Sequence, residues 1–187
     1  MSDTASRRYP RPIIALHWLT FLLVVFAYIF MEFRDIFDRG SAGREFMKAT
    51  HYSLGLTILG LTLARVLIRL VSGPAPAITP TPSALQEFAA RVVHIALYAF
   101  LIAMPFIGWA TLNTEGDPVI FFGLEIPPLI GRDKILSGRL EELHETLGFA
   151  GYFLIGAHAL AAIVHHAVIK DNTFARIMPG KEAQKAG

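Results

Sequence analysis

Cysteine is absent from this sequence of 187 residues, and charged side chains are scarce. Charged residues make up 17% of the chain and hydrophobic residues 53%. Without cysteine, the chain has no disulfides, no thiolate-held iron–sulfur cluster and no covalent CxxCH haem attachment. It also lacks a block of like charges, so we expect no nucleic-acid partner. Any metal or cofactor must therefore be held by other side chains, above all by the seven histidines.

The sequence does contain long apolar runs. Its mean hydropathy of +0.48 is too high for a soluble domain of this size. Four runs reach the length of about 20 residues that a membrane-spanning helix needs, and their length and their richness in Leu, Ala and Phe favour helices over strands. We predict an all-α integral membrane four-helix bundle, surrounded by membrane lipid and formed by residues 1–187 as one domain. The predicted helices cover about residues 12–31, 51–71, 88–112 and 143–169.

The distribution of lysine and arginine predicts how the bundle is oriented. With an even number of spans, both termini lie on the same side of the membrane. The flanks on that side carry more Lys and Arg than the two opposite loops, and their basic residues lie closer to the helix ends. The positive-inside rule therefore places both termini in the cytoplasm.

Four histidines lie inside these apolar segments at matched depths. His144 and His158 are fourteen residues apart, a spacing that turns a helix by about 1400° and raises it by about 21 Å. The two therefore share a face at two levels. His51 begins the second segment at the level of His144, and His17 lies as far from the outer end of its segment as His158 does from the outer end of the fourth.

The count of two histidines per level favours haem over a simple metal ion. Zinc takes three or four protein ligands, whereas haem iron asks the protein for only one or two. Two stacked bis-histidine haems fit this count, and helix bundles build such sites from facing helices. A lone histidine on an apolar face is more often a packed core or interfacial residue. A transporter or structural bundle without haem is therefore the competing interpretation.

Other residues near the two levels allow two interpretations each. Gly55 and Gly148 follow their histidines by four positions and either make room for a porphyrin or pack helices together. Arg65 and Arg69 either pair with haem propionates or extend to the membrane interface. His165 lies seven residues, or about two helical turns, beyond His158. It either binds a quinone headgroup or is an interfacial histidine.

Several motifs resemble the bacterial cytochrome b561 family over nearly the whole chain, from Tyr9 to Pro179. The segments that carry the resemblance are ALHW, YIFMEFRDIF, ATHYSLG, RVLIRL, LHETLGFAGYFLIGAHALAAIVHH and KDNTFARIMPG. The resemblance implies a multi-pass protein of the bacterial cytoplasmic (inner) membrane that holds two haem b groups and exchanges electrons with quinone. The implied iron ligands are His17 and His158 for the inner haem and His51 and His144 for the outer one.

The sequence is similar in particular to family members that act as superoxide oxidases. This similarity implies electron transfer from periplasmic superoxide to ubiquinone, with His165 at the quinone end. The alternative is an electron-carrier subunit that anchors a separate periplasmic dehydrogenase or hydrogenase, with the loop VIFFGLEIPPLI as its docking surface. The outer loops hold more acidic than basic residues, so they do not attract a superoxide anion overall.

Overall fold

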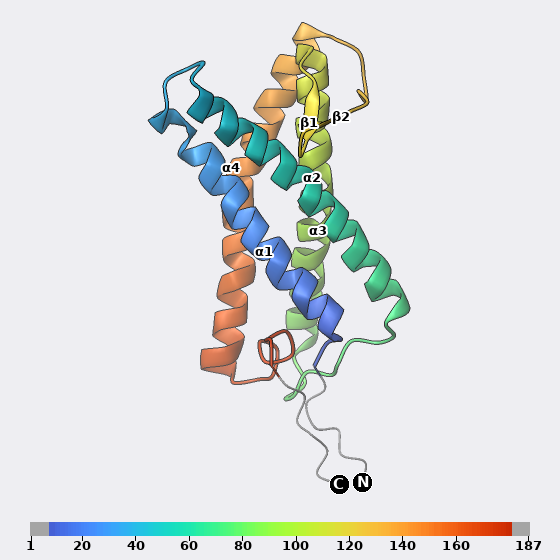
Figure 1. The fold of residues 1–187 in the computed structure, drawn as a ribbon. Coiled ribbons are helices and arrows are strands. Elements are labelled where there is room, and N and C mark those ends of the chain that lie inside the picture. Colours follow the sequence, from blue (N-terminus) through green and yellow to red (C-terminus); the bar gives the residue numbers. More distant parts are fainter. Residues whose placement is uncertain (1–7, 181–187) are drawn as a thin grey trace.

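A computed structural model describes residues 8–180 and shows the predicted four-helix architecture (Figure 1). All four long helices are long and apolar enough to cross a membrane. This confirms the prediction of an all-α membrane four-helix bundle. The helices are α1 (Arg11–Glu32), α2 (Ala42–Val71), α3 (Ala84–Glu115) and α4 (Lys134–Val164); the short elements are the 3-10 turn η1 (Arg34–Ile36), strands β1 (Val119–Phe121) and β2 (Leu124–Ile126), and the π-helical turn η2 (His165–Ile169).

All four helices begin before the apolar runs that predicted them, α1 by a single residue. In particular, α2 begins at Ala42 rather than at residue 51, and α4 at Lys134 rather than at residue 143. Side-chain caps fix these starts: Ser41 accepts a hydrogen bond from the Arg44 amide, and Asp133 accepts from two amides of α4. The added turns are polar, so hydropathy alone did not reveal them.

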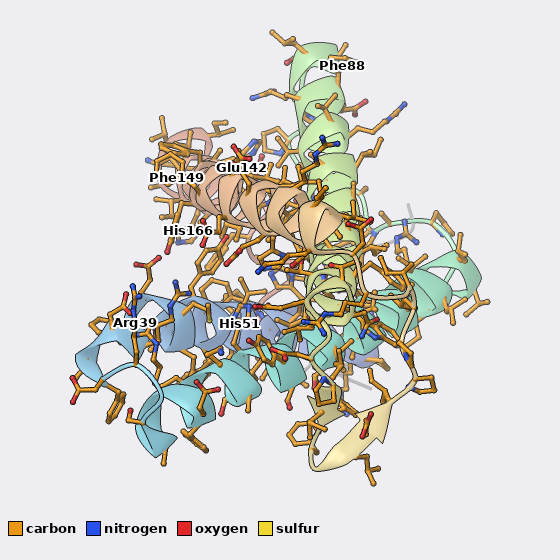
Figure 2. The ribbon with its side chains drawn as sticks, turned by 90° about the horizontal axis from the view of Figure 1, so that it is seen from above. Arg39, His51, Phe88, Glu142, Phe149 and His166 are labelled. Carbon is orange, nitrogen blue, oxygen red and sulfur yellow. The ribbon has the colours of Figure 1, made fainter. Side chains whose placement is uncertain are left out.

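The helices pack as two pairs, α1 along α2 and α3 along α4, and contacts between α2 and α3 join the pairs. Viewed from above, the helices surround a central region into which many side chains project (Figure 2). The buried apolar cluster is small, built on Val24, Ala27 and Ile58. The bundle is therefore held together around a core that leaves space between facing helices.

The start of α1 and the end of α4 lie at the same end of the bundle, here called the inner end (Figure 1). The segment after η2 folds back across it. Asn172 accepts a hydrogen bond from the Thr79 amide at 2.9 Å, and the Trp18 indole donates to the Ile177 carbonyl at 2.8 Å. These contacts attach the C-terminal segment both to the α2–α3 linker and to α1.

Candidate functional site

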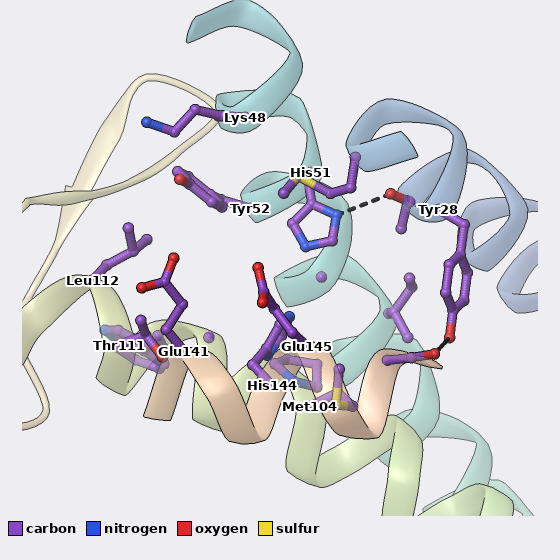
Figure 3. Close-up of a pocket in the computed structure, with 18 of the residues that line it drawn as sticks. Tyr28, Lys48, His51, Tyr52, Met104, Thr111, Leu112, Glu141, His144 and Glu145 are labelled. Atoms are coloured by element: carbon purple, nitrogen blue, oxygen red, sulfur yellow. Dashed lines mark hydrogen bonds between the residues drawn. The ribbon is translucent and has the colours of Figure 1, made fainter. Parts of the chain in front are cut away.

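The outer histidine pair is formed by His51 on α2 and His144 on α4. Their ring centroids are 6.2 Å apart and their planes are inclined by 84°. Figure 3 shows the two rings on facing helices, with His51 bonded to a backbone carbonyl of α1. That bond joins His51 Nδ1 to the Ala27 carbonyl at 3.0 Å. A proton donated from Nδ1 leaves Nε2 free to bind a metal, the arrangement usual for metal-binding histidines.

A cavity of about 650 Å³ surrounds this pair. Glycines keep it open: a methyl group added at Gly55 would meet no atom within 4 Å, and one added at Gly148 would meet only the Met104 side chain, at 3.8 Å. On α3, Gly108 has a different role, because a Cβ there would approach His144 Cε1 to 3.1 Å. Gly108 thus lets the His144 ring lie against α3.

Charged side chains line the outer part of this cavity, and acidic groups outnumber basic ones. Arg44 is engaged in an ion pair with Asp35. The surroundings of the outer pair are therefore negative on balance at neutral pH. The acidic residues are Glu32, Asp35, Glu115, Asp117, Glu141 and Glu145, and the basic residues are Arg34, Arg44 and Lys48.

The inner histidine pair is formed by His17 on α1 and His158 on α4. Its ring centroids are also 6.2 Å apart, with planes inclined by 67°. His94 on α3 lies beside this pair, with its ring centroid 5.3 Å from that of His158. Its Nδ1 lies 2.6 Å from the Ala90 carbonyl. Three imidazoles therefore meet at the inner level, one more than the predicted ligand pair.

Arg65 on α2 accompanies the inner pair. It interacts electrostatically with both His17 and His158. Its Nε is buried without a hydrogen-bond partner in the described part of the chain, and its guanidinium lies 5.6 Å from the centre of the Tyr98 ring. Arg69, the other candidate for a propionate contact, instead donates to the Gly73 carbonyl at the end of α2.

His165 begins the π-helical turn below the inner pair and binds Asp171 of the C-terminal segment. The distance between His165 Nδ1 and Asp171 Oδ2 is 2.5 Å, and the Asp171 side chain is 1% exposed. The Thr173 amide donates to the second carboxylate oxygen at 2.8 Å. Burial raises the pKa of Asp171, but the hydrogen bonds from His165 and Thr173 outweigh it and hold that pKa below its ordinary value.

Comparison with known proteins identifies the family. The model of prokaryotic cytochrome b561 matches residues 8–180. The chain is 42% identical over 168 residues to the "Probable superoxide oxidase CybB" of Yersinia pestis, covering 90% of this chain and 94% of that protein. It is 37% identical over 175 residues to "Cytochrome b561 homolog 1" of Escherichia coli (strain K12), covering 94% and 99%. The chain belongs to the prokaryotic cytochrome b561 family. The predicted family is confirmed, and with it electron transfer in a bacterial membrane.

This family binds haem b, and the histidine spacing suits it. Ring centroids 6.2 Å apart leave room for one metal ion between two imidazoles, because metal–imidazole bonds measure about 2.0 Å. Both pairs have this separation. Within residues 8–180, no group of three or more His, Cys, Asp or Glu could hold a metal ion by itself. The donor sets therefore fit a cofactor that brings its own ligands.

Sequence reasoning assigned no role to Gly108 or Asp171, and it gave His94 only as a weaker alternative to His165 for the quinone contact. Gly108 belongs to α3, for which no site residue was predicted, and only the crossing of α3 with α4 reveals its contact with His144. Asp171 follows the last helix, and only the fold-back of the C-terminal segment brings it to His165.

Proposed function

We propose that this chain is a di-haem b cytochrome that carries single electrons across the bacterial inner membrane, from periplasmic superoxide to ubiquinone. The observation that carries the proposal is the presence of two histidine pairs with the same 6.2 Å ring separation in one bundle. The α4 members of the two pairs, His144 and His158, are fourteen residues apart, or about 21 Å along the helix axis. Two such levels are suited to a relay across a bilayer.

The four histidines hold the cofactors and determine the chemistry available. His51 and His144 would bind the outer haem, and His17 and His158 the inner one. When bound, haem b supplies one-electron oxidation and reduction. Two histidines would leave no open position for a substrate on each haem, which favours electron transfer over oxygen activation. Arg65, with its buried free Nε, is suited to bind a propionate of the inner haem.

We place ubiquinone at the inner end, next to His165. The carboxylate of Asp171 fixes the His165 ring through Nδ1, so that Nε2 is free to bond a quinone oxygen and deliver a proton. With both termini in the cytoplasm, the protons come from that side. The overall reaction balances as two superoxide anions, one ubiquinone and two protons giving two oxygen molecules and one ubiquinol.

Superoxide as donor is supported by the relative from Yersinia pestis, whose name describes it as a probable superoxide oxidase. The open outer cavity offers an approach to the outer pair from the aqueous side. Its excess of carboxylates is unfavourable for a superoxide anion. This acidic lining favours the second candidate function, an electron-carrier subunit that accepts electrons from a separate periplasmic dehydrogenase or hydrogenase with a basic docking surface.

Visible spectroscopy of the detergent-purified protein tests both candidates. The oxidised protein is exposed without oxygen to a superoxide source, first alone and then with ubiquinone. For an oxidase, we expect superoxide to reduce two haems per chain and quinone to reoxidise them. Two haems that quinol reduces but superoxide does not would instead identify the carrier subunit. A protein without a Soret band would contradict both.

A further inference from the structure

The β-hairpin between α3 and α4 has one buried end and one projecting end. Strands β1 and β2 pair antiparallel, with Val119 opposite Ile126. Val119 is 2% exposed and lines the outer cavity. Ser53 of α2 holds the hairpin through its hydroxyl, which accepts a bond from the Phe122 amide at 3.4 Å and donates to the Ile120 carbonyl at 3.5 Å. The backbone of β1 is thus held from its buried start at Val119 to the turn at Phe122, while the side chains at the tip remain exposed.

The tip carries an aromatic residue where the backbone disfavours one. Phe122 and Gly123 form a two-residue turn with φ of +47° and +86°. Turns with two positive φ values favour Asn-Gly, and a bulky side chain in this region is strained. The Phe122 side chain contacts the Phe121 ring yet remains 72% exposed. Strain at an exposed aromatic residue points to a role outside the fold of the chain itself.

The surroundings of the tip are apolar. Viewed from above, the hairpin projects from the edge of the bundle (pale yellow in Figure 2). Leu124 is 71% exposed, and Glu125 is the only charged residue from Pro118 to Gly131. The tip is bonded to Ser53 of α2. Lys48 is the last charged residue at the outer end of α2, and Ser53 lies five residues farther into the membrane segment. This is about 7.5 Å along the helix.

We propose that the hairpin tip, residues 121–124, inserts into the outer leaflet and binds lipid at the boundary between headgroups and acyl chains. Phe and Leu side chains of interfacial segments are buried at this depth. The hairpin ladder and Ser53 provide partners for backbone groups that lipid could not satisfy. Because β1 lines the outer cavity, anchoring of the tip in lipid also holds that wall in place. This inference does not depend on the haems or on the electron donor.

The absence of cysteine allows a direct test by spin labelling. A nitroxide is attached at Phe122→Cys in full-length protein in lipid nanodiscs, and its collisions with oxygen and with a water-soluble nickel chelate are compared. Phe153→Cys, on the exposed face of α4, is the lipid reference, and Arg39→Cys, in the α1–α2 connection, is the water reference. We expect the oxygen-to-nickel ratio at position 122 to exceed that at position 39 several-fold and to approach that at position 153.

Either of two outcomes would overturn the proposal. A ratio equal to that of the Arg39 label would place the tip in water. Protection from both reagents would show that protein, either a partner or a second copy, covers it. Detergent-solubilised samples run in parallel report whether each labelled variant is folded, through its thermal unfolding.

A second experiment separates anchoring from turn formation. Phe122→Asn creates the favoured Asn-Gly turn, so its thermal stability in detergent should equal or exceed that of the parent. The nitroxide is now attached at Leu124→Cys. In this background we expect Phe122→Asn to lower the oxygen-to-nickel ratio several-fold relative to the parent Phe122, and Phe122→Trp to preserve it. Equal ratios in the Asn and Trp variants would show that the aromatic side chain does not anchor the tip.

Discussion

The outer and inner histidine pairs share a ring separation of 6.2 Å but lie in different surroundings. An open cavity with an excess of carboxylates surrounds the outer pair. The inner pair has Arg65 and a third imidazole, His94, as neighbours. The C-terminal segment folds across the end of the bundle beyond it.

This difference in charge favours one direction of electron flow. Negative groups near a redox centre disfavour the added electron and lower its potential, whereas a cation raises it. The outer centre should therefore have the lower potential and the inner centre the higher one. The two pairs share a ring separation, so under the proposed function the surrounding charges, and not the ligands, would distinguish the two centres and favour transfer from the outer to the inner one.

The most damaging changes should be those to the iron ligands. His144→Ala should remove the outer haem and His158→Ala the inner one, because each leaves its iron with a single histidine. Each variant should bind one haem per chain in place of two, measured by the pyridine haemochrome method, and should lose superoxide-driven quinone reduction. His166→Ala, which removes a histidine whose ring centroid lies 5.3 Å from that of Phe174, is the control and should keep both haems. Loss of both haems from every ligand variant would contradict the pairing.

Next in size should be the effect of changes at the inner end. His165→Asn should slow quinone reduction by a factor of about 10² to 10⁴, the usual contribution of a positioned acid or base. It should leave reduction of the haems by superoxide intact, which stopped-flow spectroscopy with and without ubiquinone would show. Equal slowing of both steps would mean that His165 acts elsewhere than at the quinone.

Asp171→Asn tests the support of His165. Loss of the buried carboxylate should reduce the free energy of unfolding by about 1–3 kcal/mol. Because the pKa of Asp171 is lowered in the fold, its contribution is complete above the ordinary value of about 3.9 and is lost as pH falls through the folded value. The difference in thermal unfolding between parent and variant should therefore be constant from pH 8 to about pH 5 and shrink in stronger acid. A difference that grew below pH 5 would contradict this.

A smaller effect should follow from removing the inner cation. Arg65→Met should lower the potential of the inner haem by about 50 mV, close to a tenfold change in a one-electron equilibrium. The outer potential should move much less, so the gap between the two centres should narrow in a spectroelectrochemical titration. Arg69→Met, which removes the side chain bonded to Gly73, is the matched control and should change neither potential appreciably.

The length and composition of the apolar runs predicted the helices, and the rise and turn along a helix predicted the partners within each histidine pair. His158 follows His144 by fourteen residues, which places the two on one helix face at two depths. His51 and His17 were then matched to them by their distances from the outer ends of their own segments. Contacts that form only where the chain reverses direction could not be predicted from spacing along a helix. The Asp171–His165 bond requires the π-helical turn and the fold-back, and the strained Phe122 turn becomes visible only from backbone angles.

The acidic lining of the outer cavity should produce the smallest effect, a dependence on salt that is opposite to electrostatic steering. Because carboxylates repel superoxide, its reduction of the outer haem should become a few-fold faster as ionic strength rises and screens them. Pulse radiolysis at low and high salt would measure this rate. Glu141→Gln with Glu145→Gln should raise the low-salt rate and flatten the dependence. If the parent rate instead falls with salt, Arg34 and Lys48 govern the approach, and the outer surroundings attract the anion despite their excess of carboxylates.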